Sequence, residues 1–365
     1  MIFKNSSLKL KLFPSSMLIK GFSRSLLLDT GRNKYQLIPN TLASIIEKHE
    51  GKTYKSIYKS YPENTEILDE YFTLLDEHEH LILLDDISLF PKINLEKTTH
   101  QIISNSIIDG DNFSIEEWTK IFNQLLKLHC TNIQLRFFRE KKIEFLDRIL
   151  SLTLESKIRC IDIVLPYSLE YEQSILSFID KHQRIRYLLL HSSPKSEQIS
   201  SGSNGSQSVV LSKDRIKNES HCGFIFPEMF IMEMELYTES KHYNSCLNRK
   251  VSIDDKGDIK NCPSMSISYG NIRNTTLSEV VDNPKFREYW NIKKDDIKVC
   301  KDCEFRHICT DCRAYLENPE DMYSKPLKCG YDPYSCKWED WSQNPLKQSN
   351  LGYYEEKNFP KEVEI

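Results

Sequence analysis

The cysteines of this 365-residue chain are gathered near its C-terminal end, and their distribution constrains the fold more than any other feature of the sequence. Three of the eleven cysteines come before residue 246, and the other eight lie between Cys246 and Cys336. The densest stretch is CKDCEFRHICTDC, residues 300–312, where gaps of two, five and two residues separate four thiols. A Cys-x-x-Cys pair turns the backbone around one metal centre, so that its two sulfurs converge. Two such pairs in one short stretch predict a metal centre.

The spacing of the two pairs bears on which metal they hold. A zinc ribbon usually places roughly fifteen to twenty residues between its two Cys-x-x-Cys pairs, whereas only five residues separate them here. A tight run of cysteines is typical of iron–sulfur binding, where the last thiol of a run can serve a different cluster from the first ones. The spacing favours iron–sulfur clusters, with a zinc site as the alternative. Cys130 and Cys160, far from this run, are interpreted as small buried hydrophobic residues.

Charge and composition exclude some classes of function. The chain carries 49 Lys and Arg against 53 Asp and Glu, a net charge of −4, which argues against a general nucleic-acid or anionic-membrane binder. The N-terminal residues MIFKNSSLKLKLFPSSM lack the continuous apolar core of a secretory signal, and no run of 18 apolar residues occurs. We therefore expect a cytoplasmic protein, in which reduced thiols act as ligands rather than as disulfides.

The first 90 residues predict a small winged-helix-like domain. The apolar runs of MLIKGFSRSLLLDT, residues 17–30, precede the turn signal GRN and then KYQLIP, which predicts a β-hairpin. Helical periodicity follows over 40–51, 53–61 and 66–80, and LILLDD at 81–86 is expected to close the domain as a strand.

The middle of the chain, residues 91–236, alternates between strand and helix patterns. We expect helices at 115–128 and 142–154, and strands at 101–108, 132–138, 160–166, 185–192 and 208–212. Such alternation is typical of βαβ units on a parallel sheet and gives a mixed α/β fold class, which we interpret as a degenerate partial (β/α) barrel. Residues 237–345 have high cysteine and turn content and are expected to form a domain held by its ligands. Residues 346–365 are expected to form a C-terminal tail.

The full cysteine pattern resembles a known family. It reads C-x10-G-x4-C, then C-x2-C-x5-C-x2-C, then a downstream cysteine, and it resembles the SPASM domain, the auxiliary-cluster module of radical SAM peptide-modifying enzymes. The stretches CLNRKVSIDDKGDIKNCPS and KDDIKVCKDCEFRHICTDCRAYLENPEDMYSKPLKCGYDP resemble the SPASM protein of grasp-with-spasm peptide-maturation cassettes. The family usually has three residues in the last gap of the central run, and this chain has two.

The resemblance implies two auxiliary 4Fe–4S sites. It assigns the first site to Cys246, Cys262 and Cys312, and the second to Cys300, Cys303, Cys309 and Cys329. Three alternatives remain for the fourth ligand of the first site: Cys222, Cys336, or a position open to substrate. Arg306 and His307, which lie between two of these cysteines, are candidates for hydrogen bonds to cluster sulfur, with surface loop residues as the equal alternative.

One motif of the radical SAM family is missing. Three thiolates in the pattern Cys-x3-Cys-x2-Cys hold the cluster that binds S-adenosylmethionine, but residues 91–245 contain only Cys130, Cys160 and Cys222, with gaps of 29 and 61 residues. We therefore expect no S-adenosylmethionine site. Whether the protein is an enzyme stays open at this point.

The resemblance also implies partners. In peptide-modifying proteins of this kind a precursor's leader peptide adds as a strand to the edge of a small sheet, and residues 17–85 resemble such an element. A DNA-binding winged helix is disfavoured because SIIEKHEGKTYKSIYKSY carries mixed charge. The expected function is that of a SPASM maturation protein for a ribosomally made peptide, acting with an ATP-grasp ligase. The alternatives are a zinc-stabilised scaffold without redox chemistry and an iron–sulfur electron-transfer partner.

Overall fold

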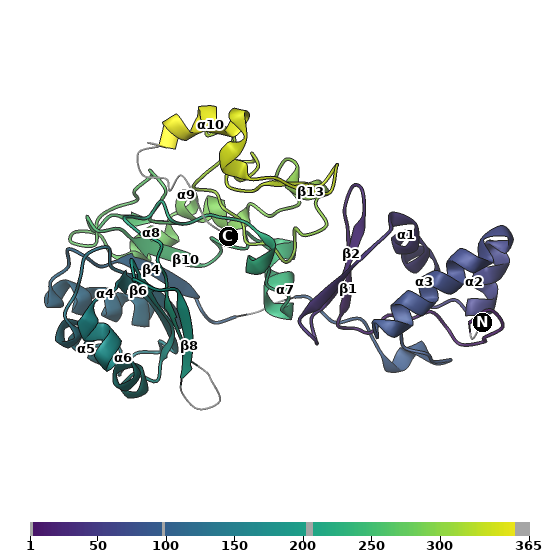
Figure 1. Ribbon diagram of the computed structural model, residues 1–365, viewed down its shortest axis with the longest axis horizontal. Helices are drawn as coiled ribbons and strands as arrows, with labels where there is room; N and C mark the ends of the chain where they lie inside the picture. The colour runs from purple at the N-terminus through teal and green to yellow at the C-terminus, as the bar shows by residue number, and fades with distance from the viewer. Residues whose placement is uncertain (1–2, 97–98, 202–206, 355–365) are drawn as a thin grey trace.

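The computed structural model describes residues 3–96, 99–201 and 207–354. A small N-terminal body lies beside a larger body built on an eight-stranded sheet (Figure 1). Phe305, Ile308 and Tyr331 pack against the N-terminal sheet. Among the described residues, no helix is long and apolar enough to cross a membrane.

The N-terminal body is a three-stranded antiparallel sheet followed by three helices. Its elements are β1 (Ser16–Lys20), β2 (Ser25–Asp29), β3 (Lys34–Ile38), α1 (Asn40–His49), α2 (Tyr54–Ser60) and α3 (Thr65–Glu77). The three predicted helices are confirmed, and so is the hairpin, but a further turn at 21–24 divides its first arm into two strands. The predicted strand at 81–86 is wrong, because this stretch makes only isolated bridges to residues 9–12. The winged-helix relationship stays a prediction.

Strand β2 explains why this sheet is buried on both faces. All five of its residues, SLLLD, are buried. Successive side chains of a strand point to opposite faces, so Leu27 packs among the three helices while Leu26 and Leu28 pack on the other side. That second side contacts Ile225 and, in the cysteine-rich region, Phe305. The N-terminal body is therefore joined to the rest of the chain through an apolar face.

The large sheet has the order β11-β10-β4-β5-β6-β7-β9-β8. Its strands are β4 (Asn105–Asp109), β5 (Asn132–Arg136), β6 (Cys160–Pro166), β7 (Ile185–His191), β8 (Glu197–Ser201), β9 (Gln207–Leu211), β10 (Lys250–Ile253) and β11 (Ile259–Lys260). The six inner strands run parallel, and the edge strands β11 and β8 pair antiparallel. The mixed α/β class with a mostly parallel sheet is confirmed. The described strands form an open sheet, and the barrel curvature stays a prediction.

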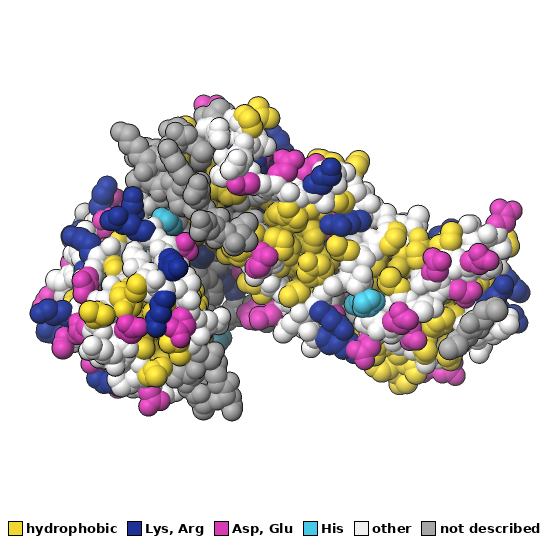
Figure 2. Space-filling model, in the orientation of Figure 1, with side chains coloured by type: hydrophobic (Ala, Val, Ile, Leu, Met, Phe, Trp, Pro, Cys, Tyr) yellow, Lys and Arg dark blue, Asp and Glu magenta, His cyan; other side chains and the backbone are white. Residues whose placement is uncertain are grey.

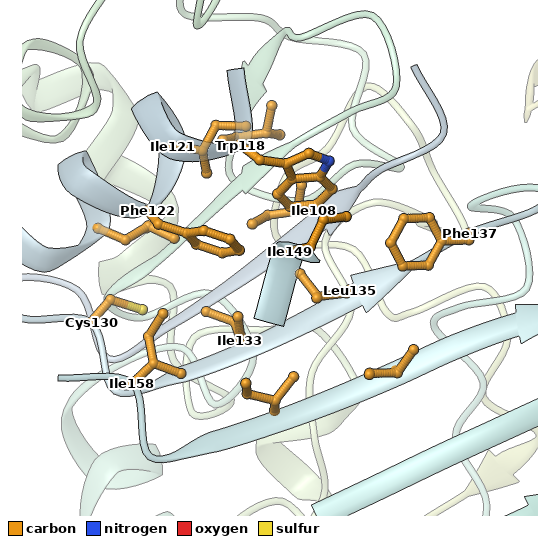
Figure 3. Packing of buried hydrophobic residues seen from close by; sticks show 14 of the residues in the cluster. Ile108, Trp118, Ile121, Phe122, Cys130, Ile133, Leu135, Phe137, Ile149 and Ile158 are labelled. Carbon is orange, nitrogen blue, oxygen red and sulfur yellow. The ribbon is translucent and has the colours of Figure 1, made fainter. Parts of the chain in front are cut away.

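Helices α4 (Ile115–Lys127), α5 (Ile143–Ser151) and α6 (Leu169–Lys181) follow β4, β5 and β6 in turn. Ser114 and Glu117 form a capping box that begins α4 and satisfies its first amide groups. Trp118 and Phe122 of α4 stack with ring centroids 5.4 Å apart and pack over the sheet beside Ile133 (Figure 3). The core is therefore the interface of this helical layer with the parallel strands.

The cysteine-rich region is part of the same core. Strand β10 pairs in parallel with β4, the first strand of the sheet, although about 140 residues separate them. The helices and remaining strands of this region are α7 (Met234–His242), α8 (Leu277–Asp282), α9 (Pro284–Arg287), β12 (Tyr331–Asp332), β13 (Lys337–Trp338) and α10 (Pro345–Leu351). Strand β10, from the predicted domain 237–345, thus belongs to the same sheet as the strands of residues 91–236. The domain boundaries at 90, 236 and 345 stay predictions.

Candidate metal centre

Four thiols from distant parts of the chain share one buried region: Cys222, Cys246, Cys262 and Cys312, here named the first thiol set. The pKa of the Cys262 thiol is raised to about 12, mainly by burial and then by the neighbouring thiols of Cys222, Cys246 and Cys312, while Lys250 opposes the shift. The pKa of the Cys312 thiol is likewise raised to about 12, mainly by burial and then by the neighbouring thiols of Cys222 and Cys246. Buried thiolates this close together need a positive partner, which a metal centre supplies.

The first thiol set depends on two local turns. The Asn244 side-chain oxygen accepts hydrogen bonds from the amides of Cys246, at 3.0 Å, and Leu247, at 2.8 Å, which fixes the backbone at the first thiol. Between β10 and β11 the chain turns at Gly257, whose φ of +88° suits glycine. Strand β11 then ends two residues before Cys262. These turns explain why the two cysteines of the motif C-x10-G-x4-C, Cys246 and Cys262, meet in the first thiol set.

Cys222 joins the first thiol set through its neighbour Gly223. A Cβ built on Gly223 would lie 2.7 Å from the sulfur of Cys312, and the φ of Gly223 is +83°. The Lys328 ammonium group donates to the carbonyl oxygens of Ser220, at 2.6 Å, and Cys222, at 2.7 Å, and so fixes this segment. Of the alternatives for a fourth thiol, the structure brings Cys222 to this position.

The second thiol set is Cys300, Cys303, Cys309 and Cys329, whose side chains line one cavity. The pKa of the Cys309 thiol is raised to about 12, mainly by burial and with contributions from Cys329 and Cys300, while Lys294 opposes the shift. Cys309 and Cys312 are three positions apart, yet they belong to different sets. The last gap of the central run is two residues, and it still separates the two sites.

Two backbone contacts organise the second thiol set. The amide of Phe305 donates to the sulfur of Cys303 at 3.4 Å, which is the turn expected after a Cys-x-x-Cys pair. Ile225 pairs with Cys329 through a parallel bridge, and its amide donates to the Lys328 carbonyl at 3.2 Å. The segment after Cys222 and the segment around Cys329 are therefore side by side, which connects the two thiol sets.

Basic side chains that no sequence motif indicates contact the thiols directly. Lys250 donates to the sulfur of Cys246 at 3.3 Å, and Lys294 donates to the sulfur of Cys309 at 3.5 Å. Lys250 begins β10, and Lys294 lies in a turn before the central run. Lysines are common in both kinds of position, so only the folded arrangement identifies these two.

Arg306 and His307, the two candidates for hydrogen bonds to sulfur, have other partners. Arg306 donates to Asp295 at 2.8 Å and to the carbonyl of Cys303 at 2.9 Å. His307 is fully buried, and its Nδ1 lies 3.1 Å from the Ser240 hydroxyl. Burial lowers the pKa of His307 to about 3, so it is neutral. These two residues hold the loop of the second thiol set in place.

Three cysteines lie apart from the two sets. Cys130 is fully buried in the sheet core and donates to the Asn132 carbonyl at 3.3 Å, as expected of a structural thiol. Cys160 begins β6 and is half-buried, which is less burial than we expected. Cys336 has a φ of +58°, and its thiol faces the Pro333 carbonyl at 3.9 Å. No contact of the described residues brings Cys336 into either set.

The N-terminal body lies directly against the second thiol set. The amide of Phe22, in the turn between β1 and β2, donates to the carbonyl of Asp302 at 2.8 Å. A Cβ on Gly21 would lie 2.8 Å from the backbone nitrogen of Glu304, so the turn approaches too closely for a larger residue. Figure 2 shows hydrophobic side chains gathered where the two bodies meet. The second thiol set is therefore built on contacts from both ends of the chain.

The donor chemistry of both sets fits iron–sulfur clusters. All eleven cysteines are free thiols, and each set supplies the four thiols that a 4Fe–4S cluster takes. Within residues 3–96, 99–201 and 207–354, no group of three or more His, Cys, Asp or Glu side chains is arranged to hold a single metal ion.

Comparison with known proteins identifies the same region. Residues 245–304 match the family model of SPASM, an iron-sulfur cluster-binding domain. The AdoMet-dependent heme synthase of Nitratidesulfovibrio vulgaris (strain Hildenborough) is 28% identical over 83 residues, and the match spans 22% of this chain and 22% of that protein.

Among solved structures, Streptococcus suis SuiB is similar with a TM-score of 0.39 and 11% identity, over 88% of this chain and 97% of that one. SuiB bound to precursor peptide SuiA is similar with a TM-score of 0.27 and 9% identity, over 87% and 98%. The segment similar to SPASM thus holds four of the clustered thiols, two from each set: Cys246, Cys262, Cys300 and Cys303.

Proposed function

We propose that this chain is a SPASM-type maturation protein of the grasp-with-spasm kind, which binds a ribosomally made precursor peptide and carries two auxiliary 4Fe–4S clusters. The observation that carries the proposal is the sorting of eight thiols into two groups of four, buried or half-buried, within and around a segment that matches an iron-sulfur cluster-binding domain. The free thiols suit a reducing compartment, and we place the protein in the cytoplasm.

The proposed ligands are the members of the two thiol sets. Cys222 is the fourth ligand of the first cluster, because the turn at Gly223 places it beside Cys312. Cys336 is a ligand of neither cluster. A bound cluster supplies a centre that accepts and releases single electrons, and the chain's own part is to bury it, surround it with donors and separate it from water.

The precursor's leader is proposed to bind the N-terminal sheet beside α1. A groove of about 310 Å³ is lined by residues 11–14, edge strand β1, helix α1, and Lys92, Ile93 and Leu95. Its apolar lining includes Leu18 and Ile93, and Glu47 and Lys92 stand at its sides. An edge strand offers unpaired backbone groups, so an extended peptide can add to it while apolar pockets select its side chains.

Bond formation on the precursor is proposed to belong to a separate ATP-grasp ligase. This chain lacks the Cys-x3-Cys-x2-Cys motif of radical SAM enzymes. At the carboxyl edge of the parallel sheet, where ligands of α/β proteins usually bind, Arg136 and Asp109 instead form a buried two-point ion pair at 2.6 and 2.9 Å. The proposed role of this protein is therefore to present the precursor and to carry electrons.

Anaerobic purification followed by metal analysis tests the proposal. We expect about eight iron and about eight sulfide per chain, the content of two 4Fe–4S clusters, with broad visible absorbance. Stoichiometric zinc without sulfide would support the scaffold alternative and exclude the proposed function. The Cys222→Ser variant is expected to lose about half the iron, and the Cys336→Ser variant is the matched control that keeps all of it.

A further inference from the structure

Each thiol set has one lysine whose ammonium group donates to a ligand sulfur. Lys250 contacts Cys246 at 3.3 Å, and Lys294 contacts Cys309 at 3.5 Å. A positive charge at this distance favours the more negative, reduced form of a cluster, and so does a hydrogen bond to sulfur. The two lysines are therefore placed to raise the reduction potential of the clusters that the proposed function assigns to these sites.

Cations dominate the surroundings of the first thiol set, although Asp311, which is paired with Arg313, also faces Cys312. No carboxylate of the described residues lies within 4.0 Å of the Lys250 ammonium group, so its charge is directed at the thiols. Lys328 adds a second ammonium group, fully buried and bonded to the Cys222 carbonyl. Arg136 also faces Cys222 and Cys262, with its charge balanced by Asp109.

The surroundings of the second thiol set are balanced. Lys294 lies 3.5 Å from the carboxylate of Asp311, which also pairs with Arg313 at 2.6 Å. Glu304 is fully buried beside Cys303, and its partner is Arg24 at 2.6 Å. A carboxylate thus accompanies the cations on this side, and it weakens the field of Lys294 at the cluster.

We propose, on the basis of the function proposed above, that Lys250 and Lys294 set the reduction potentials of the two clusters and that the first cluster is reduced at the higher potential. When bound, each cluster would take up one electron from dithionite, and the cluster held by the first thiol set would take up its electron first. The two lysines act through the cysteine sulfurs: each places a positive charge beside a proposed ligand and does not contact the substrate.

A stepwise reduction of the anaerobic full-length protein with dithionite, followed by electron paramagnetic resonance, tests this inference. Cys262→Ser and Cys303→Ser, which alter one site each, assign the two signals. We expect the signal altered by Cys262→Ser to develop at the higher potential. The Lys250→Met change should move that step to a more negative potential and leave the other in place, and Lys294→Met should do the converse.

Two controls separate charge from structural damage. Lys181→Met removes an exposed ammonium group that pairs with Asp147 on the helical layer, and should move neither step. Lys250→Arg keeps the positive charge, so the reduction potential of the first cluster should stay close to that of the unchanged protein. The inference is overturned if the second site is reduced first, or if Lys250→Met shifts both signals as little as Lys181→Met. If Lys250→Met fails to bind clusters, the order of the two steps in the unchanged protein still decides. Absence of iron and sulfide would instead refute the proposed function itself.

Discussion

Arg24 and Glu304 form an ion pair across 280 residues of sequence, with Nε of Arg24 2.6 Å from Oε1 of Glu304. The Glu304 side chain is fully buried and that of Arg24 is 30% exposed. The pair joins the turn between β1 and β2 to the residue that follows Cys303. The N-terminal body is thereby fastened to the second thiol set by a charged contact inside an apolar interface.

The Arg24→Ala change is expected to lower the free energy of unfolding by roughly 2–3 kcal/mol, because it leaves the buried Glu304 carboxylate without its cation. The partial exposure of Arg24 keeps the expected effect below that of a fully buried pair. Urea unfolding measures it. Lys20→Ala is the matched control: its pair with Glu47 is exposed on both sides, so about 0.5 kcal/mol is expected. Equal effects of the two changes would contradict the importance of this junction.

The sequence alone predicted the parts of the molecule that depend on local pattern. The strand periods at 160–166 and 185–192 correspond to β6 and β7. Contacts between distant segments could not be predicted in this way. Nothing local in Lys250 indicates that β10 will pair with β4 or that its side chain will reach a thiol.

His80 is expected to make the N-terminal body less stable in acid. It is 1% exposed, its Nδ1 lies 2.9 Å from the Ser16 hydroxyl, and burial lowers its pKa from 6.5 to about 4. The unfolded chain takes up this proton near pH 6.5 and the folded chain only near pH 4. The contribution of neutral His80 is therefore complete above pH 6.5 and is lost progressively as the pH falls toward 4, by at most about 3 kcal/mol.

Unfolding of the unchanged protein and of His80→Gln between pH 7 and pH 4.5 measures this loss. The variant should show a shallower decline over that range. An identical decline in both proteins would mean that His80 does not contribute to the acid sensitivity.

Gly223→Ala is expected to disturb the first thiol set selectively. The added Cβ would meet the sulfur of Cys312 at 2.7 Å, and the φ of +83° disfavours alanine by roughly 1–2 kcal/mol. Iron bound per chain should fall toward half, while the signal of the second set remains. Gly31→Ala, where the new Cβ would have ordinary clearance of 3.4 Å, is the control. Full iron content in Gly223→Ala would show that the segment after Cys222 is not close to the first site.

Ile93→Glu is expected to weaken binding of a precursor peptide about tenfold. Ile93 lines the groove beside β1 and is 40% exposed, so a charge there removes apolar contact with a bound peptide, worth about 1.4 kcal/mol, without disrupting the core. Isothermal titration calorimetry, with a short precursor peptide encoded by a gene adjacent to that of this protein, measures the change in the dissociation constant. Ile102→Glu is the control, because Ile102 is 41% exposed and lies outside this groove. If both variants bind equally well, the leader binds elsewhere.

Iron and sulfide per chain in three anaerobically prepared proteins test the central claim most directly. The unchanged protein should hold about eight of each, and Cys262→Ser and Cys303→Ser should each hold about four, because every variant loses one cluster and keeps the other. Loss of all iron in both single variants, or no loss in either, would contradict the division of the eight thiols into two independent sites.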